Sequence, residues 1–202
     1  RTMSDLMAPL IHDVNYTTSS ISIGDLTLNP SWSYGYGVLV PANMPATISE
    51  GSFHDYIPES WRLMNLSYRK HEARALARSY LQYFGEPGFT TGAIAGVLRD
   101  PEHGVDYYAL SSLNDHRRPI NSITVSIEPG GLIYAGDENN NGYFCRDSLA
   151  PGSYQVIATA AGYTADTTTI TVQANHTSFA NFYLVDIAPP FVTFSSPTDG
   201  DT

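Results

Sequence analysis

The chain has 202 residues and a net charge of −10 at pH 7, and 42% of its residues are hydrophobic against 15% charged. This composition excludes an intrinsically disordered chain, and the acidic excess disfavours nucleic-acid binding because phosphate groups would be repelled. No run of about 18 apolar residues is present, so we expect no membrane-spanning helix.

The N-terminal part, residues 1–86, is expected to form the C-terminal part of an incomplete, hydrolase-like α/β domain. Apolar side chains spaced at i, i+4 and i+8 predict a helix over residues 4–14, with a kink or a late start at Pro9. Short β-type runs follow at residues 36–40 and 46–49.

A long helix is predicted over residues 58–84. Pro58 suits its first turn, Gly85 ends it, and apolar side chains recur near a period of 3.6. His71 is expected to form a surface pair with Glu72. The remaining bases are expected to form a solvated face, made of Arg62, Arg69, Lys70, Arg74 and Arg78.

From residue 87 onward the hydrophobic pattern changes to a period of two. The charge changes at the same place, because residues 1–86 carry −2 and residues 87–202 carry −8. Strand-like runs separated by Gly, Pro and Asn turns predict an all-β sandwich over residues 87–185. Residues 186–202 are expected to be a linker and the start of a further immunoglobulin- or fibronectin-like β-sandwich, so we expect a multidomain fragment of a longer protein.

Residues 44–55 and the helix after them resemble the end of the zinc-dependent N-acetylmuramoyl-L-alanine amidase family, including its xanthan-lyase-like members. In that family a strand ending in Glu is followed by Gly-x-Phe, a polar pair and a closing helix. The matching residues here are Pro45, Ile48, Glu50, Gly51, Phe53, His54 and Asp55. The resemblance implies that Glu50 is the catalytic carboxylate, which shuttles a proton while zinc lowers the pKa of the attacking water to ~7. His54 and Asp55 are the candidate substrate-binding residues.

The zinc ligands of that family, two His and one Glu, lie upstream of the part that this sequence resembles. No histidine pair here has the spacing of a metal motif, so no metal ligand is assigned in this chain. We therefore expect zinc in the parent protein and none in this chain alone, which should have no turnover. The expected partner is the rest of the same polypeptide or a separate N-terminal fragment that completes the site.

A second resemblance covers about residues 90–184, which look like the carboxypeptidase regulatory-like, transthyretin-type β-sandwich. The matching motifs are Gly92-x-Ile-x-Gly-x-Val-x-Asp100, Asn141-Gly-Tyr-Phe144, Leu149-Ala-Pro-Gly-Ser-Tyr-Gln-Val156 and Ala160-Ala-Gly-Tyr163. The resemblance implies about seven strands and no activity, because such modules serve as spacers, stabilisers of a neighbouring domain or adhesion units.

Three functions remain open. The first is a fragment of a secreted, periplasmic or cell-surface bacterial zinc amidase-like hydrolase, acting on cell-wall peptide or saccharide-linked amides. The second is a non-catalytic surface adhesion, carbohydrate-binding or spacer protein with a degenerate hydrolase domain. The third is a fragment of a zinc metallocarboxypeptidase. Peptidoglycan or polysaccharide is the candidate partner outside the chain.

Two further features favour structural roles. The stretch Asp137-Glu-Asn-Asn-Asn-Gly142 has the beginning of a calcium-loop spacing, but Ser148 stands where that loop needs Glu, so a turn is predicted. The single cysteine, Cys145, excludes an internal disulfide and is predicted to be a packed thiol.

Overall fold

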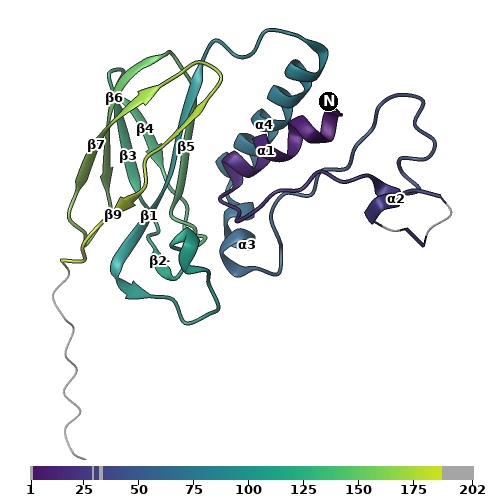
Figure 1. The fold of residues 1–202 in the computed structure, drawn as a ribbon. Helices are drawn as coiled ribbons and strands as arrows, with labels where there is room; N and C mark the ends of the chain where they lie inside the picture. The colour runs from purple at the N-terminus through teal and green to yellow at the C-terminus, as the bar shows by residue number, and fades with distance from the viewer. Residues whose placement is uncertain (1, 29, 32–33, 188–202) are drawn as a thin grey trace, which may run out of the picture.

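The structure is a computed structural model that describes residues 2–28, 30–31 and 34–187. Two β-sheets pack face to face, and helices cover the outer face of one sheet (Figure 1). The helices are α1 (Met3–Asn15), α2 (Asp25–Leu28), α3 (Ile57–Met64), α4 (Leu66–Phe84) and the short 3-10 helix η1 (Ser111–Leu113). All the strands of the described part follow α4.

The first sheet is built around one long strand. This central strand, β1, pairs antiparallel with β5 along its first half and with β2 further on. It also pairs parallel with the two short strands β8 and β9, which come last in the described chain. The strands are β1 (Gly92–Gly104), β2 (Arg117–Pro119), β5 (Tyr143–Leu149), β8 (Thr177–Phe179) and β9 (Phe182–Tyr183).

The second sheet is antiparallel throughout, with strand order β4-β3-β6-β7. Its strands are β3 (Thr124–Glu128), β4 (Leu132–Ala135), β6 (Gly152–Thr159) and β7 (Asp166–Val172). Val125 and Ile127 of β3 and Val156 and Ala158 of β6 are fully buried between the sheets. The alternation of these apolar residues with polar ones is the period-two signal of the sequence, so the predicted sandwich is confirmed.

The central strand is buried on both faces. Ile94 and Leu98 point into the core between the sheets. Ala95 and Val97 point the other way and pack in a second cluster with Tyr68 of α4 and with Tyr143. The unbroken apolar run Ala93-Ile-Ala-Gly-Val-Leu98 follows from this double burial.

The predicted helix over residues 58–84 is in fact two helices, because Asn65 interrupts it. Its backbone is extended (φ −75°, ψ 123°), and its side-chain oxygen accepts hydrogen bonds from the backbone N–H of Ser67 (2.9 Å) and Tyr68 (3.2 Å). An asparagine cap of this kind offers the backbone an alternative to helix continuation. The new helix then ends, as predicted, at Gly85, whose φ is 72°.

The solvated basic face predicted for this helix is wrong in part. Arg62 is 2% exposed, His71 is 3% exposed and Arg78 is 8% exposed, because this side of the helices faces the sandwich or α1. His71 forms no surface pair with Glu72. The Glu72 carboxylate instead accepts a hydrogen bond from the side chain of Asn15 (2.9 Å).

The α/β domain predicted over residues 1–86 is not formed. Within its described residues there is no strand, since 36–40 form turns and 46–49 are irregular. A strand needs a neighbour to satisfy its backbone groups, and none of the described segments provides one there. The described residues between 18 and 50, which we name the arm, extend away from the helices instead (Figure 1).

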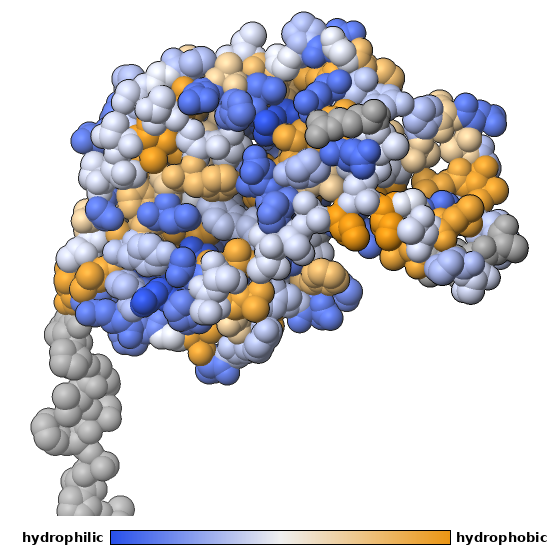
Figure 2. Space-filling view, viewed as in Figure 1, coloured by the Kyte–Doolittle hydropathy of each residue, from blue (hydrophilic) through white to orange (hydrophobic). Residues whose placement is uncertain are grey.

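The arm is unusually apolar for an exposed segment. Figure 2 shows apolar side chains gathered on the side of the molecule where the arm lies. More than half of the surface of Ile21, Val38 and Met44 is exposed. The arm is held to α1 by Ser22, whose hydroxyl donates to Asp5 (2.8 Å). The predicted start of a further sandwich, in residues 186–202, falls almost wholly outside the described residues.

Candidate functional site at the helix–sandwich interface

The three predicted site residues lie on an exposed, irregular part of the chain. Glu50, at the end of the arm, and His54 and Asp55, just before α3, are all exposed, and Glu50 is not at the end of a strand. None of the three belongs to a group of potential metal ligands within the described part of the chain. Their catalytic and substrate-binding roles therefore stay predictions.

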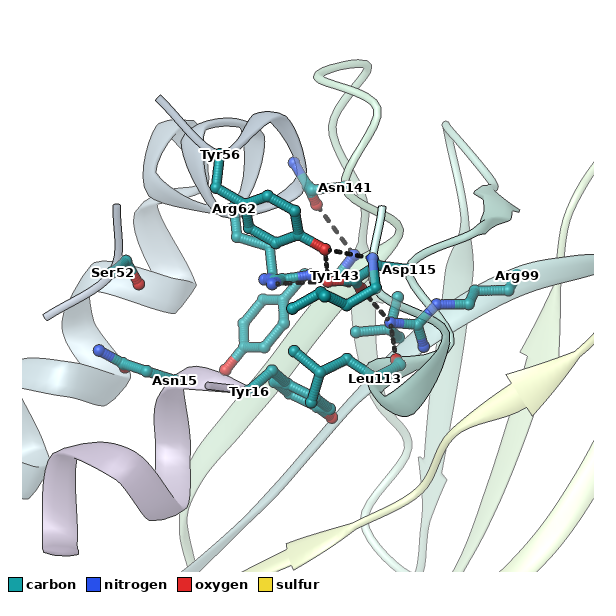
Figure 3. A network of polar contacts seen from close by, with 12 residues as sticks. Asn15, Tyr16, Ser52, Tyr56, Arg62, Arg99, Leu113, Asp115, Asn141 and Tyr143 are labelled. Atoms are coloured by element: carbon teal, nitrogen blue, oxygen red, sulfur yellow. Dashed lines mark hydrogen bonds and ion pairs between the residues drawn. The ribbon is translucent and has the colours of Figure 1, made fainter. Parts of the chain in front are cut away.

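The densest chemistry lies in the interface between helix α3 and the sandwich. Asp115, which follows η1, receives a bidentate ion pair from Arg62 of α3, with N–O distances of 2.9 and 3.2 Å. Arg99 of β1 donates to the same carboxylate at 2.9 Å. All three side chains are at most 3% exposed. Figure 3 shows these groups converging from three different segments.

Two further groups surround this carboxylate. The hydroxyl of Tyr56 donates to Asp115 (3.2 Å) and accepts from the backbone N–H of Leu110 (2.8 Å). Glu59, which is 5% exposed, accepts a hydrogen bond from the backbone N–H of Phe53. Burial raises the pKa of Glu59, against the opposing effects of that hydrogen bond and of the Arg62 charge. The cluster therefore joins two arginines with two carboxyl groups.

A second network fixes the junction between α3 and α4. The amide nitrogen of Asn65 donates to Asp137 (2.9 Å), and the amide nitrogen of Asn141 donates to the other oxygen of Asp137 (2.8 Å). Asn141 also donates to the backbone oxygen of Trp61 (3.3 Å). The Asp137–Gly142 stretch is thus a bend whose side chains hold the helices. Both oxygens of the Asp137 carboxylate, which a calcium ion would need as ligands, already accept hydrogen bonds from amide groups.

A third set of contacts joins α4 to the first sheet. The ring nitrogens of His71 lie 2.7 Å from the hydroxyl of Tyr143 and 2.8 Å from that of Thr177. Burial, together with the charges of Arg74 and Arg78, lowers the pKa of His71 to about 4. The imidazole is therefore neutral at pH 7, as a buried structural group must be.

The cysteine is a structural group as well. Cys145 lies beside Tyr143 on the sheet face that α4 covers. Burial raises the pKa of its thiol to about 12. Because the thiolate is the nucleophilic form, this thiol is not poised for catalysis at neutral pH.

One group of side chains has the spacing of metal ligands. Asp100, His103 and Asp186 place ligand atoms within 4.8 Å of one another. Arg118 occupies the same group, with N–O distances of 2.6 Å to Asp100 and 3.8 Å to Asp186. Burial acts to raise the pKa of Asp100, but backbone N–H groups and the side chains of Arg118 and His103 donate to it and lower the pKa to about 2. Arg118 thus supplies the positive charge that a cation would bring.

The interface residues were not identified from the sequence as a site. Arg62 and Asp115 are 53 positions apart, so no local pattern joins them. One signal was present in β1, where Arg99 and Asp100 continue an apolar strand without a turn. Charged residues inside a buried strand require partners, and such partners had to come from elsewhere in the fold.

Comparison with known proteins supports the sandwich. The profile of the family described as carboxypeptidase regulatory-like domain matches residues 113–185. This match agrees with the second resemblance found in the sequence, whereas the amidase resemblance stays a prediction. No curated protein matches the chain in sequence.

Several solved structures share local similarity with the chain. A minor pilin of Streptococcus agalactiae is 17% identical, with a TM-score of 0.36 over 55% of this chain and 50% of that one. The Bacillus anthracis TIE protein is 13% identical, with a TM-score of 0.35 over 48% of this chain and 17% of that one. A type II cohesin–X–dockerin complex of Acetivibrio cellulolyticus is 20% identical, with a TM-score of 0.29 over 45% and 52%. The chain thus spans about half or less of each of these three structures.

Proposed function

We propose that this chain is a non-catalytic spacer module of a secreted or cell-surface protein, in which a β-sandwich and the helices before it form one rigid unit. The observation that carries the proposal is the buried ion cluster of Arg62, Arg99 and Asp115, which joins helix α3 to the sandwich. Spacer roles are common for the carboxypeptidase regulatory-like fold that residues 113–185 match.

The composition of the interface supports a permanent attachment. A mobile contact between domains is usually open to water, whereas here Tyr68, Tyr143 and Arg62 are at most 2% exposed. Tyr68 and Tyr143 also meet edge to face, with ring centroids 5.1 Å apart. Separating the helices would expose these rings and leave buried charges without partners. The sandwich therefore cannot be treated as an independent domain of this chain.

No group in the described interface is arranged for hydrolysis. Its carboxylates are bonded to arginine or amide donors, its histidine is neutral and its cysteine is protonated. No helix of the described chain combines the length and the hydropathy needed to cross a bilayer. Placement outside the cell follows from the kind of fold and is part of the proposal.

Native-state hydrogen exchange tests the proposal. We expect the amides of α4 and of β1 to open with the same free energy, because neither can leave its partner without global unfolding. Purified chain supplied with zinc should also fail to hydrolyse a muramoyl-alanine amide. Exchange of α4 while β1 stays protected, or amide turnover, would overturn the proposal.

A second candidate is the hydrolytic role of the parent protein, and the arm is the observation that favours it. Its exposed apolar side chains are what one segment of an α/β domain would present if other residues normally covered it. In that case Glu50 would act as the catalytic carboxylate, with His54 and Asp55 at the substrate. Zinc and its ligands would come from the rest of the polypeptide or from a separate N-terminal fragment.

Elemental analysis of a longer form of the protein separates the two candidates. Near-stoichiometric zinc together with amide hydrolysis that Glu50→Ala abolishes would establish the hydrolase. A longer protein without zinc and without amide hydrolysis would support the spacer function. Amide hydrolysis that survives Glu50→Ala would rule out Glu50 as the catalytic carboxylate.

A further inference from the structure

A cavity of about 570 Å³ lies where helix α3 meets the loops at one end of the sandwich. Its size falls within the range of about 300–1,000 Å³ that is typical of small-molecule sites. The lining comes from segments far apart in the sequence, with aromatic and polar side chains interspersed. They include Trp61 of α3, Tyr107 of the β1–β2 loop, Arg118 of β2, Asn140 of the β4–β5 segment and Tyr163 after β6.

The aromatic rings of this cavity are held in place. The rings of Trp61 and Tyr107 meet at 86° with centroids 5.1 Å apart, so they form two adjacent walls. The hydroxyl of Tyr163 donates to Asp100 (3.2 Å) and accepts from Arg118 (3.0 Å). Asp100 is fully buried, which fixes this corner of the cavity in turn. A ligand would therefore meet preformed surfaces and would bind without ordering them first.

Unused hydrogen-bonding groups accompany these rings. Among the contacts of the described chain, the indole N–H of Trp61 and the hydroxyl of Tyr107 have no hydrogen-bond partner. Asn140 accepts from Asn121 (2.8 Å) through its side-chain oxygen, which leaves its amide donors available. Within the described residues, Arg118 donates to Asp100 and to Tyr163 through one terminal nitrogen, Nη2. The cavity thus combines apolar ring faces with separate hydrogen-bond donors.

The charge of the cavity disfavours an anionic ligand. The positive charge of Arg118 is matched by Asp100 at 2.6 Å and by Asp186 at 3.8 Å. Asp106 adds an exposed carboxylate to the lining. The whole chain also carries −10, which repels anions at long range. A phosphorylated or uronic-acid ligand would therefore find no free positive charge there.

We propose that this cavity binds a neutral oligosaccharide, a function that goes beyond the spacer role. A pyranose ring has C–H groups on its faces and hydroxyls around its rim. The faces match the walls formed by Trp61 and Tyr107, and the hydroxyls match the donors of Arg118 and Asn140 and the acceptor Asp106. A saccharide is also the kind of ligand that a secreted spacer meets on a cell surface or on a polysaccharide.

Tryptophan fluorescence measures this binding directly. Trp32→Phe leaves Trp61 as the single tryptophan of the chain. Titration of that protein with cellohexaose and chitohexaose should shift its emission and saturate with a Kd on the order of 0.1–1 mM for at least one of them. Polygalacturonate, an anionic polysaccharide, should give no saturation at the same sugar concentration.

Two variants connect the binding to the cavity. Trp61→Ala, followed by calorimetry in place of fluorescence, should weaken binding at least tenfold. Tyr107→Phe removes one hydroxyl that has no hydrogen-bond partner among the described residues, so it should keep the stability and weaken binding about threefold to tenfold. Tyr80→Ala, at an exposed position of α4 outside the cavity, is the matched control and should bind as the unmodified chain does.

Three results would overturn the proposal. They are failure of both neutral hexaoses to saturate by about 10 mM, equal binding of polygalacturonate, and binding that Tyr107→Phe and Trp61→Ala leave unchanged. None of these results depends on the hydrogen-exchange experiment. The spacer role can therefore be overturned without overturning the saccharide site, and the saccharide site can be overturned without overturning the spacer role.

Discussion

Asp115 shows at the residue scale how one carboxylate can join two parts of a fold. It forms ion pairs with Arg62 from the helices and with Arg99 from the central strand, and all three side chains are buried. The three charged residues can be read from the sequence. Their contact cannot be predicted from it, because that contact depends on how distant segments pack. The predicted solvated face of the helix failed at Arg62 for this reason. The packed character of Cys145, in contrast, follows from its apolar neighbours in the sequence and could be predicted.

Replacement of this carboxylate should be costly. We expect Asp115→Ala to lower the free energy of unfolding by about 3–5 kcal/mol, because it leaves two buried guanidinium groups without their counter-charge. Urea denaturation measures the change. Glu102→Ala, at an exposed position of the same sandwich, should stay within about 0.5 kcal/mol of the unmodified chain. A loss below about 1 kcal/mol for Asp115→Ala would mean that the cluster does not stabilise the interface.

His71 should make stability depend on pH. Its folded pKa is about 4, against about 6.5 for an unfolded histidine. At a pH between these two pKa values, His71 is protonated in the unfolded chain and neutral in the folded protein. The free energy of unfolding should therefore fall as the pH falls from about 6.5 to about 4, by on the order of 3 kcal/mol in total.

Urea denaturation at pH 7 and at pH 4 tests this dependence. His71→Gln cannot take up the proton, so its loss of stability over that window should be smaller by most of that amount. His54→Gln, on the exposed backbone before α3, is the matched control. Equal pH dependence in the unmodified chain and in His71→Gln would rule out His71 as the responsible group.

At the scale of elements, the sequence predicted those strands whose signal is local, and it failed where a strand depends on contacts with distant segments. The strands of the sandwich could be predicted because period-two alternation and turn residues are local. β2 and β4 give only a weak signal in the sequence, since they are short and carry little alternation. The expected strands at 36–40 and 46–49 failed because a strand needs a partner, which the local sequence does not supply. The burial of β1 on both faces is indicated by its unbroken apolar run. The sequence does not indicate which element covers the second face.

β1 also contains a glycine that the packing requires. A Cβ on Gly96 would lie 1.9 Å from the backbone oxygen of Ala180, which a side-chain shift cannot relieve. Gly96→Ala should therefore destabilise the protein by roughly 2–4 kcal/mol as the first sheet is pushed apart. Gly37→Ala is the matched control, because no atom lies within 4 Å of the added methyl group. Thermal unfolding compares the two, and equal melting temperatures would contradict the packing of β8 and β9 on β1.

At the scale of the whole molecule, the helices and sandwich form one body and the arm stands apart from it (Figure 1). The exposed side chains of Ile21, Val38 and Met44 give the arm an apolar surface that water does not favour. We expect the isolated chain to self-associate weakly through this surface. The triple variant Ile21→Ser, Val38→Ser, Met44→Ser should shift the sedimentation coefficient toward that of a monomer.

The melting temperature of this variant should stay unchanged, because the replaced side chains pack against no core. A triple variant made at exposed polar positions of the sandwich, Asp147→Ser, Asp166→Ser and Thr169→Ser, serves as the control for altered surface composition. Self-association that persists in the arm variant would place the contact elsewhere on the molecule.

The parallel pairing of β1 with β8 and β9 has a mechanical consequence. The chain enters the sandwich at the start of β1 and leaves it after β9, and these neighbouring strands run in the same direction. Tension applied between the two ends therefore pulls the strands along each other. The backbone hydrogen bonds between them are loaded in shear and must break together, instead of opening one after another as in a zipper. The order of the strands thus makes the sandwich a stiff link under load.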